Sequence, residues 1–385
     1  MNDGRGRFTD ATEAAGLAAK RWRRTYSASL TDLDEDGDAD LVVVSDFAGV
    51  DLYANNGRGR FEEVTSRWLA DPKVFGMSHA LADFDSDGRL DLLVTGMHCP
   101  TALRLDALGL SRPERPDYAA MRGAMVRGNR LWRGLGGGRF GDAPAQSSIA
   151  HSGWSWGCAA ADFDNDGFLD VYITNGHETR QQTRDYDAEF WRHDIYVGDS
   201  KENPVALAYF TSKLGRTRGH GMSYGGYEKN RLYLNLAGQS FVEVAHLLGV
   251  AVETDSRNLV ADDFDGDGRV DLIFTTFEAW PRKQQTLQVW QNRLPDAGQW
   301  IGLRLRTAIG VPPVLAGRVQ LTAGGRSTPC AVLAGDSHRS QRSGVVHFGL
   351  GTHAGPVRLR IEPVGGAAVE LGERIPGHYH SFPAR

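Results

Sequence analysis

Four short segments of the chain carry acidic residues at a spacing suited to binding a metal ion. Each has Asp at its first, third, fifth and ninth positions and Gly at its sixth. The acidic residues are Asp32, Asp34, Asp36 and Asp40; Asp83, Asp85, Asp87 and Asp91; Asp162, Asp164, Asp166 and Asp170; and Asp263, Asp265, Asp267 and Asp271. Carboxylates at this spacing converge when the backbone curls around a hard cation, and Ca²⁺ takes about six to eight oxygen ligands. Gly permits the sharp turn at positive φ. The sequence therefore predicts four calcium-binding loops.

The seventh and twelfth positions of these loops decide which kind of calcium site they form. The seventh position should contribute its backbone carbonyl. Its occupants are chemically unrelated, as expected where the side chain is not a ligand: Asp38, Arg89, Phe168 and Arg269. An EF-hand needs a bidentate Glu at position 12 and flanking helices. The twelfth residues here are apolar and lie in strand-like sequence: Val43, Val94, Ile173 and Phe274. The sequence therefore excludes an EF-hand.

The ion should matter for folding. Four carboxylates this close would repel one another without a cation, so we expect calcium removal to loosen the fold. The alternative, that the segments are acidic turns without metal, is disfavoured because the pattern occurs four times, each time before an apolar strand.

The loops recur within a repeat that predicts how they are positioned. The first unit, Tyr26–Thr65, is expected to form a strand, the acidic loop, two strands, a glycine-rich turn and a last strand. Further units begin at Met77, Trp156 and Arg257. The fourth lacks a last strand, and Asn2–Thr12 matches it. We therefore expect the N-terminal segment to join the fourth unit and close a ring; the alternative is an open stack of hairpins.

The segments DFDSDGRLDLLVTG, DFDNDGFLDVYITNG and DFDGDGRVDLIFTT resemble FG-GAP/VCBS repeats, known from integrin-type β-propellers. The resemblance covers about Asn2–Asn292, interrupted by two inserts. It implies that each acidic loop joins the first and second strands of a blade and that its ion is structural. The expected fold is all-β, with a calcium-stabilised, propeller-like repeat domain over residues 1–296. Four blades are evident, and the inserts or the C-terminal region could supply further blades, up to seven in all.

The chain after Trp300 has no acidic loop, and alternating apolar residues predict short strands. The order of its motifs resembles the ASPIC/UnbV domain of cartilage acidic protein relatives and enediyne-cluster proteins. The motifs are Trp300–Leu303, Ala308–Gly310, Gly317–Val319, Gly335–Ser337, Ser340–Ser343 and His347–Gly351. Val311–Ala316 interrupts the usual pattern, and Glu362–Gly365 replaces a Trp-Pro-x-Gly. We assign residues 297–385 to this small β-domain, and the resemblance implies architecture more than activity.

Composition narrows the class of protein. The 385 residues include 47 Gly and 15 Pro, which favours many turns and β-structure. The net charge of −5 shows no basic excess for nucleic acid. Three cysteines make no disulfide framework, and no apolar stretch is long enough for a membrane span. No signal peptide is visible, so we expect a cytoplasmic protein if the N-terminus is native and an extracellular one if it was trimmed.

Two inserts interrupt the repeat, at residues 97–128 and 177–228, each between the second and third strands of a unit. They should emerge on the same face of a ring, where long loops often carry function. Our leading interpretation is a calcium-binding propeller scaffold that recognises a small molecule, glycan or protein ligand through these inserts. Aromatic residues there and beside them could form a binding platform: Trp154, Trp156, Phe190, Trp191, Tyr196, Tyr224 and Tyr227.

The alternative is a metalloenzyme, for example in specialised-metabolite biosynthesis, with a transition metal held by imidazole and carboxylate groups. The candidate catalytic residues are His177, Glu178, His193, His220 and Tyr224. A pairing of His79 with His151 is a further option. The simpler interpretation is that these histidines are loop residues that bond the backbone. The inserts contain no HExxH, so the sequence leaves open whether the protein is an enzyme.

Overall fold

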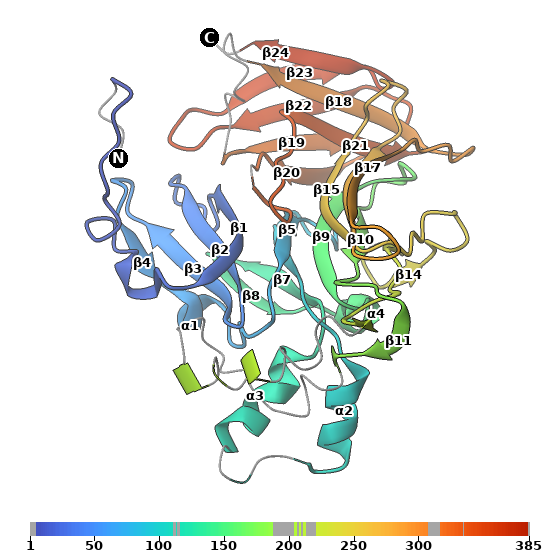
Figure 1. Ribbon diagram of the computed structural model, residues 1–385. Helices are drawn as coiled ribbons and strands as arrows, with labels where there is room; N and C mark the ends of the chain where they lie inside the picture. Colours follow the sequence, from blue (N-terminus) through green and yellow to red (C-terminus); the bar gives the residue numbers. More distant parts are fainter. Residues whose placement is uncertain are drawn as a thin grey trace.

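The computed structural model is built mainly from antiparallel sheets, with a few short helices (Figure 1). It describes residues 5–110, 113, 116–187, 204–205, 208, 211–212, 221–306, 316–333 and 335–383. Among these, sheets formed by consecutive repeat units are arranged side by side in an arc, and the last part of the chain lies across one end of that arc (Figure 1). The expected all-β, propeller-like class is confirmed.

Each repeat unit forms one sheet, which we call a blade. Blade 1 contains β1 (Arg24–Thr31), β2 (Asp40–Asp46), β3 (Gly49–Asn55) and β4 (Phe61–Glu63). Blade 2 contains β5 (Ser78–Ala82), β6 (Asp91–Thr95), β7 (Arg130–Gly136) and β8 (Arg139–Asp142). Blade 3 contains β9 (Ser155–Ala161), β10 (Asp170–Asn175), β13 (Arg231–Asn235) and β14 (Phe241–Glu243). Blade 4 contains β15 (Ser256–Asp262), β16 (Asp271–Glu278) and β17 (Gln284–Trp290).

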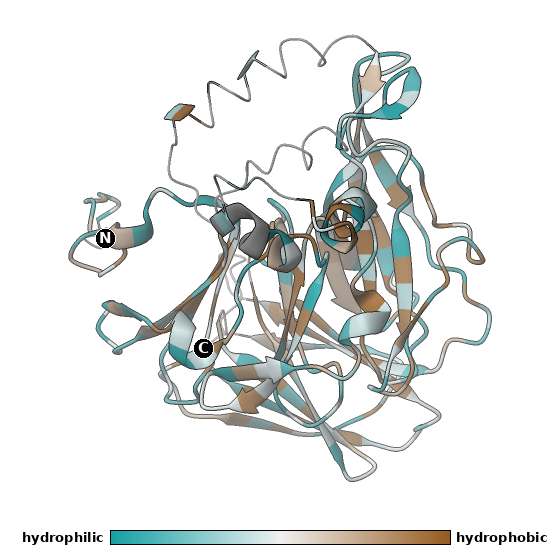
Figure 2. Ribbon diagram, turned by 90° about the horizontal axis from the view of Figure 1, so that it is seen from below, coloured by the Kyte–Doolittle hydropathy of each residue, from teal (hydrophilic) through white to brown (hydrophobic). Residues whose placement is uncertain are grey.

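The sequence folds into blades because apolar residues alternate along each strand and fill the space on both sides of each sheet. Val42 and Leu52 of blade 1 share one core with Leu92 and Trp132 of blade 2. Similar cores join blade 2 to blade 3 and blade 3 to blade 4. Figure 2, viewed from the side of the inserts, shows hydrophobic residues recurring along the strands. The blades therefore stabilise one another through their faces.

The N-terminal segment does not complete blade 4. The backbone N–H of Phe61, at the start of β4, donates to Ala15 O at 2.9 Å, so this segment pairs with blade 1. Figure 1 shows the N-terminus beside β4 and away from β17. The prediction that residues 2–12 close the ring is therefore wrong for the described residues 5–12. The described residues 5–12 form no strand, and the sequence match carried no information about where the segment packs.

The inserts lie on one side of the arc, as expected. The first contains α2 (Pro100–Ala107) and α3 (Pro116–Met125), and the second contains β11 (Gln182–Asp185) and β12 (Met222–Ser223), a parallel pair. Short helical turns occupy three other connections: η1 (Ala18–Lys20), α1 (Thr65–Trp68) and α4 (Gln146–Ile149). Since β-strand loops alternate ends, the inserts and the acidic loops lie at opposite ends of the blades. We call these ends the insert face and the loop face.

The C-terminal part forms two sheets around its own apolar core. One consists of β18 (Gln299–Arg306), β21 (Val345–Gly351) and β24 (Tyr379–Pro383). The other consists of β19 (Arg318–Ala323), β20 (Arg326–Ala331), β22 (Val357–Glu362) and β23 (Val369–Arg374). We call this part the C-terminal domain. It covers the loop face, above the blades in Figure 1.

A segment of the C-terminal domain, residues 335–343, runs between the first strands of the blades. Ser27 of β1 donates its hydroxyl to Asp336 O at 2.8 Å, and the backbone N–H of His79 in β5 donates to the same oxygen at 3.0 Å. From blade 4, Asn258 donates to His338 O at 2.9 Å. The His338 ring packs 5.2 Å from the ring of Trp156 in β9. All four blades therefore touch this segment, which we call the axial segment.

Candidate metal centres and the two faces of the blades

The four acidic loops share one local geometry. In each, a carboxylate oxygen of the first Asp accepts the backbone N–H of the Gly at position six. These N–H donors are Gly37 (3.1 Å), Gly88 (3.0 Å), Gly167 (2.8 Å) and Gly268 (2.7 Å). Their φ angles lie between 86° and 95°, a region that residues with a Cβ rarely adopt. The expected positive φ of the glycine at position six is confirmed.

The Asp at position nine anchors each loop to its blade. In blade 3, Asp170 accepts the backbone N–H of Phe163 in the loop at 3.0 Å and that of Asn235, at the end of β13, at 2.8 Å. The other loops repeat both bonds through Asp40, Asp91 and Asp271. This carboxylate therefore fixes the loop even before any ion is considered.

Carboxylate oxygens converge in every loop. In three loops the first, third and ninth positions come together, and in the first loop the first, third and fifth do so. The groups are Asp32, Asp34 and Asp36; Asp83, Asp85 and Asp91; Asp162, Asp164 and Asp170; and Asp263, Asp265 and Asp271, with one oxygen of each residue within 4.8 Å of the others. Metal binding itself, and the backbone ligands at Asp38, Arg89, Phe168 and Arg269, stay predictions.

The electrostatics of these groups favour a cation. Burial is the main cause that raises the pKa of Asp170 to about 8 and that of Asp91 to about 7, and neighbouring Asp charges add to it. Burial also raises the pKa of Asp162 well above its usual range. In the first loop, Asp32 Oδ1 is buried without a hydrogen-bond partner. Hard oxygen donors, crowded charge and an unpaired buried oxygen fit a site for Ca²⁺.

The C-terminal domain contacts the fourth-position residue of three loops. Arg318 pairs with Glu35 at 3.2 Å, Arg326 donates to the Ser86 hydroxyl, and His347 bonds the side-chain oxygen of Asn165 at 2.8 Å. All three loop residues have positive φ, so they share one backbone conformation. The C-terminal domain thus contacts the same position in each of these three loops.

Closer contacts bring this domain to the first Asp of loops three and four. The Tyr379 hydroxyl donates to Asp263 Oδ2 at 2.9 Å. A Cβ on Gly349 would lie 1.9 Å from Asp162 Oδ2, so only glycine fits there. The C-terminal domain is therefore in direct contact with predicted metal ligands.

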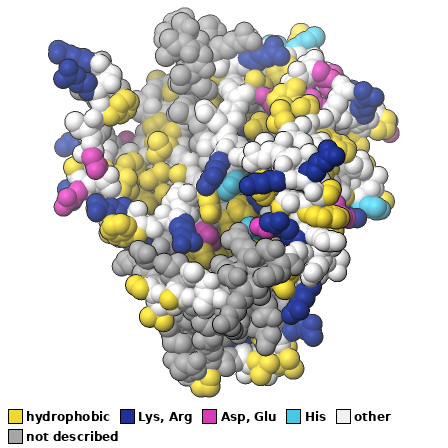
Figure 3. All heavy atoms as spheres, in the orientation of Figure 1, with side chains coloured by type: hydrophobic (Ala, Val, Ile, Leu, Met, Phe, Trp, Pro, Cys, Tyr) yellow, Lys and Arg dark blue, Asp and Glu magenta, His cyan; other side chains and the backbone are white. Residues whose placement is uncertain are grey.

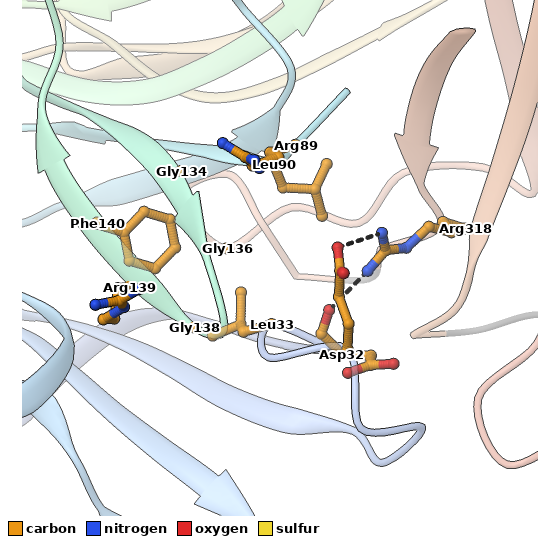
Figure 4. Close-up of a pocket in the computed structure, with 11 residues that line it drawn as sticks. Asp32, Leu33, Arg89, Leu90, Gly134, Gly136, Gly138, Arg139, Phe140 and Arg318 are labelled. Atoms are coloured by element: carbon orange, nitrogen blue, oxygen red, sulfur yellow. Dashed lines mark hydrogen bonds and ion pairs between the residues drawn. The ribbon is translucent and has the colours of Figure 1, made fainter. Parts of the chain in front are cut away.

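A small pocket lies beside the first loop (Figure 4). It has a cavity volume of about 20 Å³ and is bounded by the loop, by the β7–β8 turn of blade 2 and by Arg318. Figure 4 shows the Arg318 guanidinium directed at the loop, where it donates to Asp32 O at 3.1 Å as well as to Glu35. Arg318 thereby neutralises part of the acidic charge on this side of the pocket.

On the insert face the two inserts pack together. The Cys99 thiol, next to α2, donates to Asp187 of the second insert at 2.6 Å. Met97 and Cys99 share an apolar cluster with Trp154, Trp156 and Tyr186. Trp154 is 5% exposed and Trp156 9% exposed, so both support the inserts from below. They are packing residues rather than an open aromatic platform.

The candidate catalytic residues fall into two groups. His177 stands against Trp154 and Tyr224, with ring centroids 4.7 and 4.8 Å away. Glu178 pairs with Arg180 at 2.6 Å. His193 and His220 lie outside the described residues, as do the aromatic residues Phe190, Trp191 and Tyr196. Among the described residues, only the acidic loops bring three or more potential ligands together.

The pairing of His79 with His151 is wrong. Both ring nitrogens of His79 bond hydroxyls, of Ser27 at 2.7 Å and of Ser29 at 2.9 Å. Burial lowers the pKa of His79 to about 3, so its ring is neutral. His151 instead stacks on His98, with centroids 4.0 Å apart. Neither arrangement includes a carboxylate suited to a transition metal.

Sequence reasoning missed residues that join the loops to one another. Asn235 of blade 3 donates to Phe84 O in the loop of blade 2, and Asn292 after β17 donates to Phe163 O in the loop of blade 3, both at 2.8 Å. An Asn recurs at the end of the third strand in YANN, LYLNL and VWQNR, and this recurrence was the available signal. The C-terminal residues Arg318, Arg326 and His347 carried no such pattern.

Fold, repeated loops and C-terminal domain together define a class of protein. Residues 32–94 and 114–173 match the FG-GAP-like repeat, and residues 311–367 match the ASPIC and UnbV domain. The chain is thus a repeat protein that carries FG-GAP-like repeats followed by an ASPIC/UnbV domain.

Curated relatives support the same assignment. Cartilage acidic protein 1 of Mus musculus is 24% identical over 304 residues, which is 78% of this chain and 36% of the relative. Cartilage acidic protein 1 of Homo sapiens is 24% identical over 303 residues, 78% of this chain and 35% of the relative. The chain is homologous to these proteins and spans about a third of their length. No helix among the described residues is long and apolar enough to cross a membrane.

Proposed function

We propose that this chain is a calcium-binding scaffold that recognises a ligand or partner through its insert face. Residues 1–296 form the propeller-like part and residues 297–385 the C-terminal domain in this proposal. The scaffold itself rests on the FG-GAP-like repeats and the ASPIC/UnbV domain. The ligand is a small molecule, a glycan or a protein segment.

The four carboxylate clusters, one in each acidic loop, are the observation that carries the proposal. The Asp residues at positions one, three, five and nine would hold Ca²⁺, together with the backbone carbonyl at position seven. When bound, the ion supplies positive charge that offsets carboxylate repulsion. The chain's own residues prepare the sites. The ninth Asp fixes each loop, and the Asn donors join neighbouring loops.

The division of labour between the two faces supports recognition by the inserts. The C-terminal domain covers the loop face through Arg318, Arg326, His347 and Tyr379. The inserts occupy the opposite face and contact each other directly through Cys99 and Asp187. Loops on a rigid scaffold are common binding elements, so the insert face is where a partner would bind.

Metal analysis is the decisive measurement. We expect mass spectrometry on untagged protein to find about four calcium ions per chain and no stoichiometric transition metal. A matched variant, Asp162→Asn with Asp164→Asn, should lose one equivalent of calcium. Calcium-free protein with an unchanged melting temperature in chelator would contradict the scaffold proposal. A retained transition metal would instead favour the metalloenzyme alternative, for which the described residues supply no His–carboxylate cluster.

A further inference from the structure

Consecutive blades meet through one type of interface that occurs three times in the chain. We call the side of a blade that faces the next blade its leading face, and the opposite side its trailing face. The leading face includes the loop residue after the first Asp. This residue is almost fully buried in the first three blades: Leu33 is 9%, Phe84 3% and Phe163 3% exposed. Burial by the following blade is therefore the rule for this face.

Blade 4 breaks this rule. Its loop residue Phe264 is 44% exposed, and Val289 on β17 is 61% exposed. Val289 pairs with Ile273 in the same register in which the third strands of the other blades pair with their second strands. Its equivalents are Leu52 (0%), Leu131 (3%) and Leu232 (4%). The leading face of blade 4 thus has the composition of a blade interface but lies open to solvent.

Blade 1 is open on the complementary side. Leu30 of β1 is 42% exposed, whereas Leu81, at the same position of β5, is 2% exposed. Leu41 and Val43 on the same face are half-buried. Figure 3 shows hydrophobic side chains gathered over the first sheet. The segment around Ala15 bonds to the outer strand β4, and Leu30 on β1 stays exposed.

The hydrogen bond from an Asn side chain to a loop carbonyl of the preceding blade is also missing at the open faces of blades 1 and 4. In the internal interfaces, Asn235 and Asn292 each donate to a loop carbonyl of the preceding blade. Asn55 has the equivalent place in blade 1, and its side-chain amide donates within its own loop, to Ala39 O at 2.9 Å, as Asn235 and Asn292 also do in their loops. Asn55 Oδ1 is buried without a hydrogen-bond partner. In blade 4, the backbone carbonyl of Phe264 has the place that Phe84 O has in blade 2. It is the acceptor that an Asn of a following blade would use.

We propose that the leading face of blade 4 binds the trailing face of blade 1 of a second copy of this chain. The same two face types already pack together three times within the chain, and one of each is left at the ends. Such an interface is heterologous, because each copy contributes a different surface. Contiguous exposed apolar residues and the unpaired edge of β17 among the described strands are typical of an interaction surface. This inference goes beyond ligand recognition and leaves the insert face free.

The test uses one charged substitution on each face in calcium-containing buffer. Val289→Lys places a charge on the blade 4 face and Leu30→Lys one on the blade 1 face. Leu108→Lys, on an insert residue that is 68% exposed, is the matched control outside both faces. Sedimentation velocity and light scattering over a range of protein concentrations measure association. Circular dichroism and melting temperature establish that each variant is folded.

A heterologous interface predicts a particular outcome for mixtures. The wild type and Leu108→Lys should associate with increasing concentration, and each face variant alone should need at least about tenfold more protein, which equals about 1.4 kcal/mol. An equal mixture of the two face variants should restore dimers but nothing larger, because each retains one intact face. A monomeric wild type at all concentrations would overturn the proposal. Association that survives both substitutions, or a mixture that stays monomeric, would overturn it as well.

Discussion

The two ends of the blades differ in how regular they are. On the loop face, four segments repeat the same turn and the same backbone bonds, and each brings three carboxylates together. On the insert face, each connection is different, with helices in one insert and a parallel pair of strands in the other. The same strands support both ends. A repeated end therefore suits a common structural ion and a common partner domain, whereas an irregular end suits selective recognition.

The largest effect should come from removing the ions of the loop face. A ligand at about one hundred times its dissociation constant stabilises a fold by about 2.7 kcal/mol per site, and four sites are predicted. We expect chelation with EGTA to lower the melting temperature by more than about 10 °C in a calorimetric scan. Adding Ca²⁺ back should restore it, while Mg²⁺, which prefers a smaller octahedral site, should not. An identical melting temperature with and without EGTA would contradict a structural role for calcium on the loop face.

A smaller loss should follow when the loop loses its own anchor. Asp170→Ala leaves the backbone N–H groups of Phe163 and Asn235 without their acceptor. Each unpaired buried donor costs about 1–3 kcal/mol, so we expect a loss of about 4 kcal/mol by urea unfolding. Part of that loss should persist in EGTA, because these bonds belong to the protein. The exposed Asp142→Ala is the control, and an equal effect of the two would refute the anchoring role.

Breaking a contact between the C-terminal domain and the loops should have a smaller effect than removing the loop anchor. Arg326→Ala removes bonds to the Ser86 hydroxyl and to Gly167 O. Bonds to charged groups contribute about 1.5–3 kcal/mol, so hydrogen exchange in β19 and β20 should rise while blades 1–3 stay protected. Arg358→Ala, whose side chain is 72% exposed, should leave exchange unchanged. Faster exchange throughout the chain would mean a general loss of stability instead.

The mildest prediction concerns the insert face and pH. Burial raises the pKa of Glu228 from 4.5 to about 8, and its carboxyl accepts the backbone N–H of Trp154. The folded state favours the neutral form. Its stabilisation is therefore fully present below pH 4.5 and is lost as the pH rises through about 8. We expect Glu228→Gln to flatten the decline of melting temperature over this range. A parallel decline in both proteins would exclude Glu228 as its cause.

These contrasts explain what the sequence could and could not predict. The acidic loops, the glycine at position six and the strand order of blades 1–3 follow from local rules, because a turn and its flanking strands are specified by neighbouring residues. The positions of the inserts on one face follow from the alternation of strand direction. Local rules of this kind extend over a single repeat.

Long-range packing was not predictable in the same way. Residues 5–12 have the composition of an outer strand, but their partner depends on which blade edge lies within reach. The loop residues that meet the C-terminal domain, Glu35, Ser86 and Asn165, share a backbone conformation and no side-chain chemistry. Glu228 carries no signal of burial, because it becomes buried only when Trp154 and the second insert pack around it.

The axial segment sets the order in which the molecule can be completed during synthesis. Ser27 and Asp336, which bond at the centre of the blades, are separated by 309 positions in the chain. The first strand of blade 1 leaves the ribosome early, yet its bond to Asp336 can form only after all four blades have been made. Earlier blades must therefore persist as a partly formed array. Since such arrays expose apolar surface and strand edges, translation of the axial segment ends the period of greatest exposure.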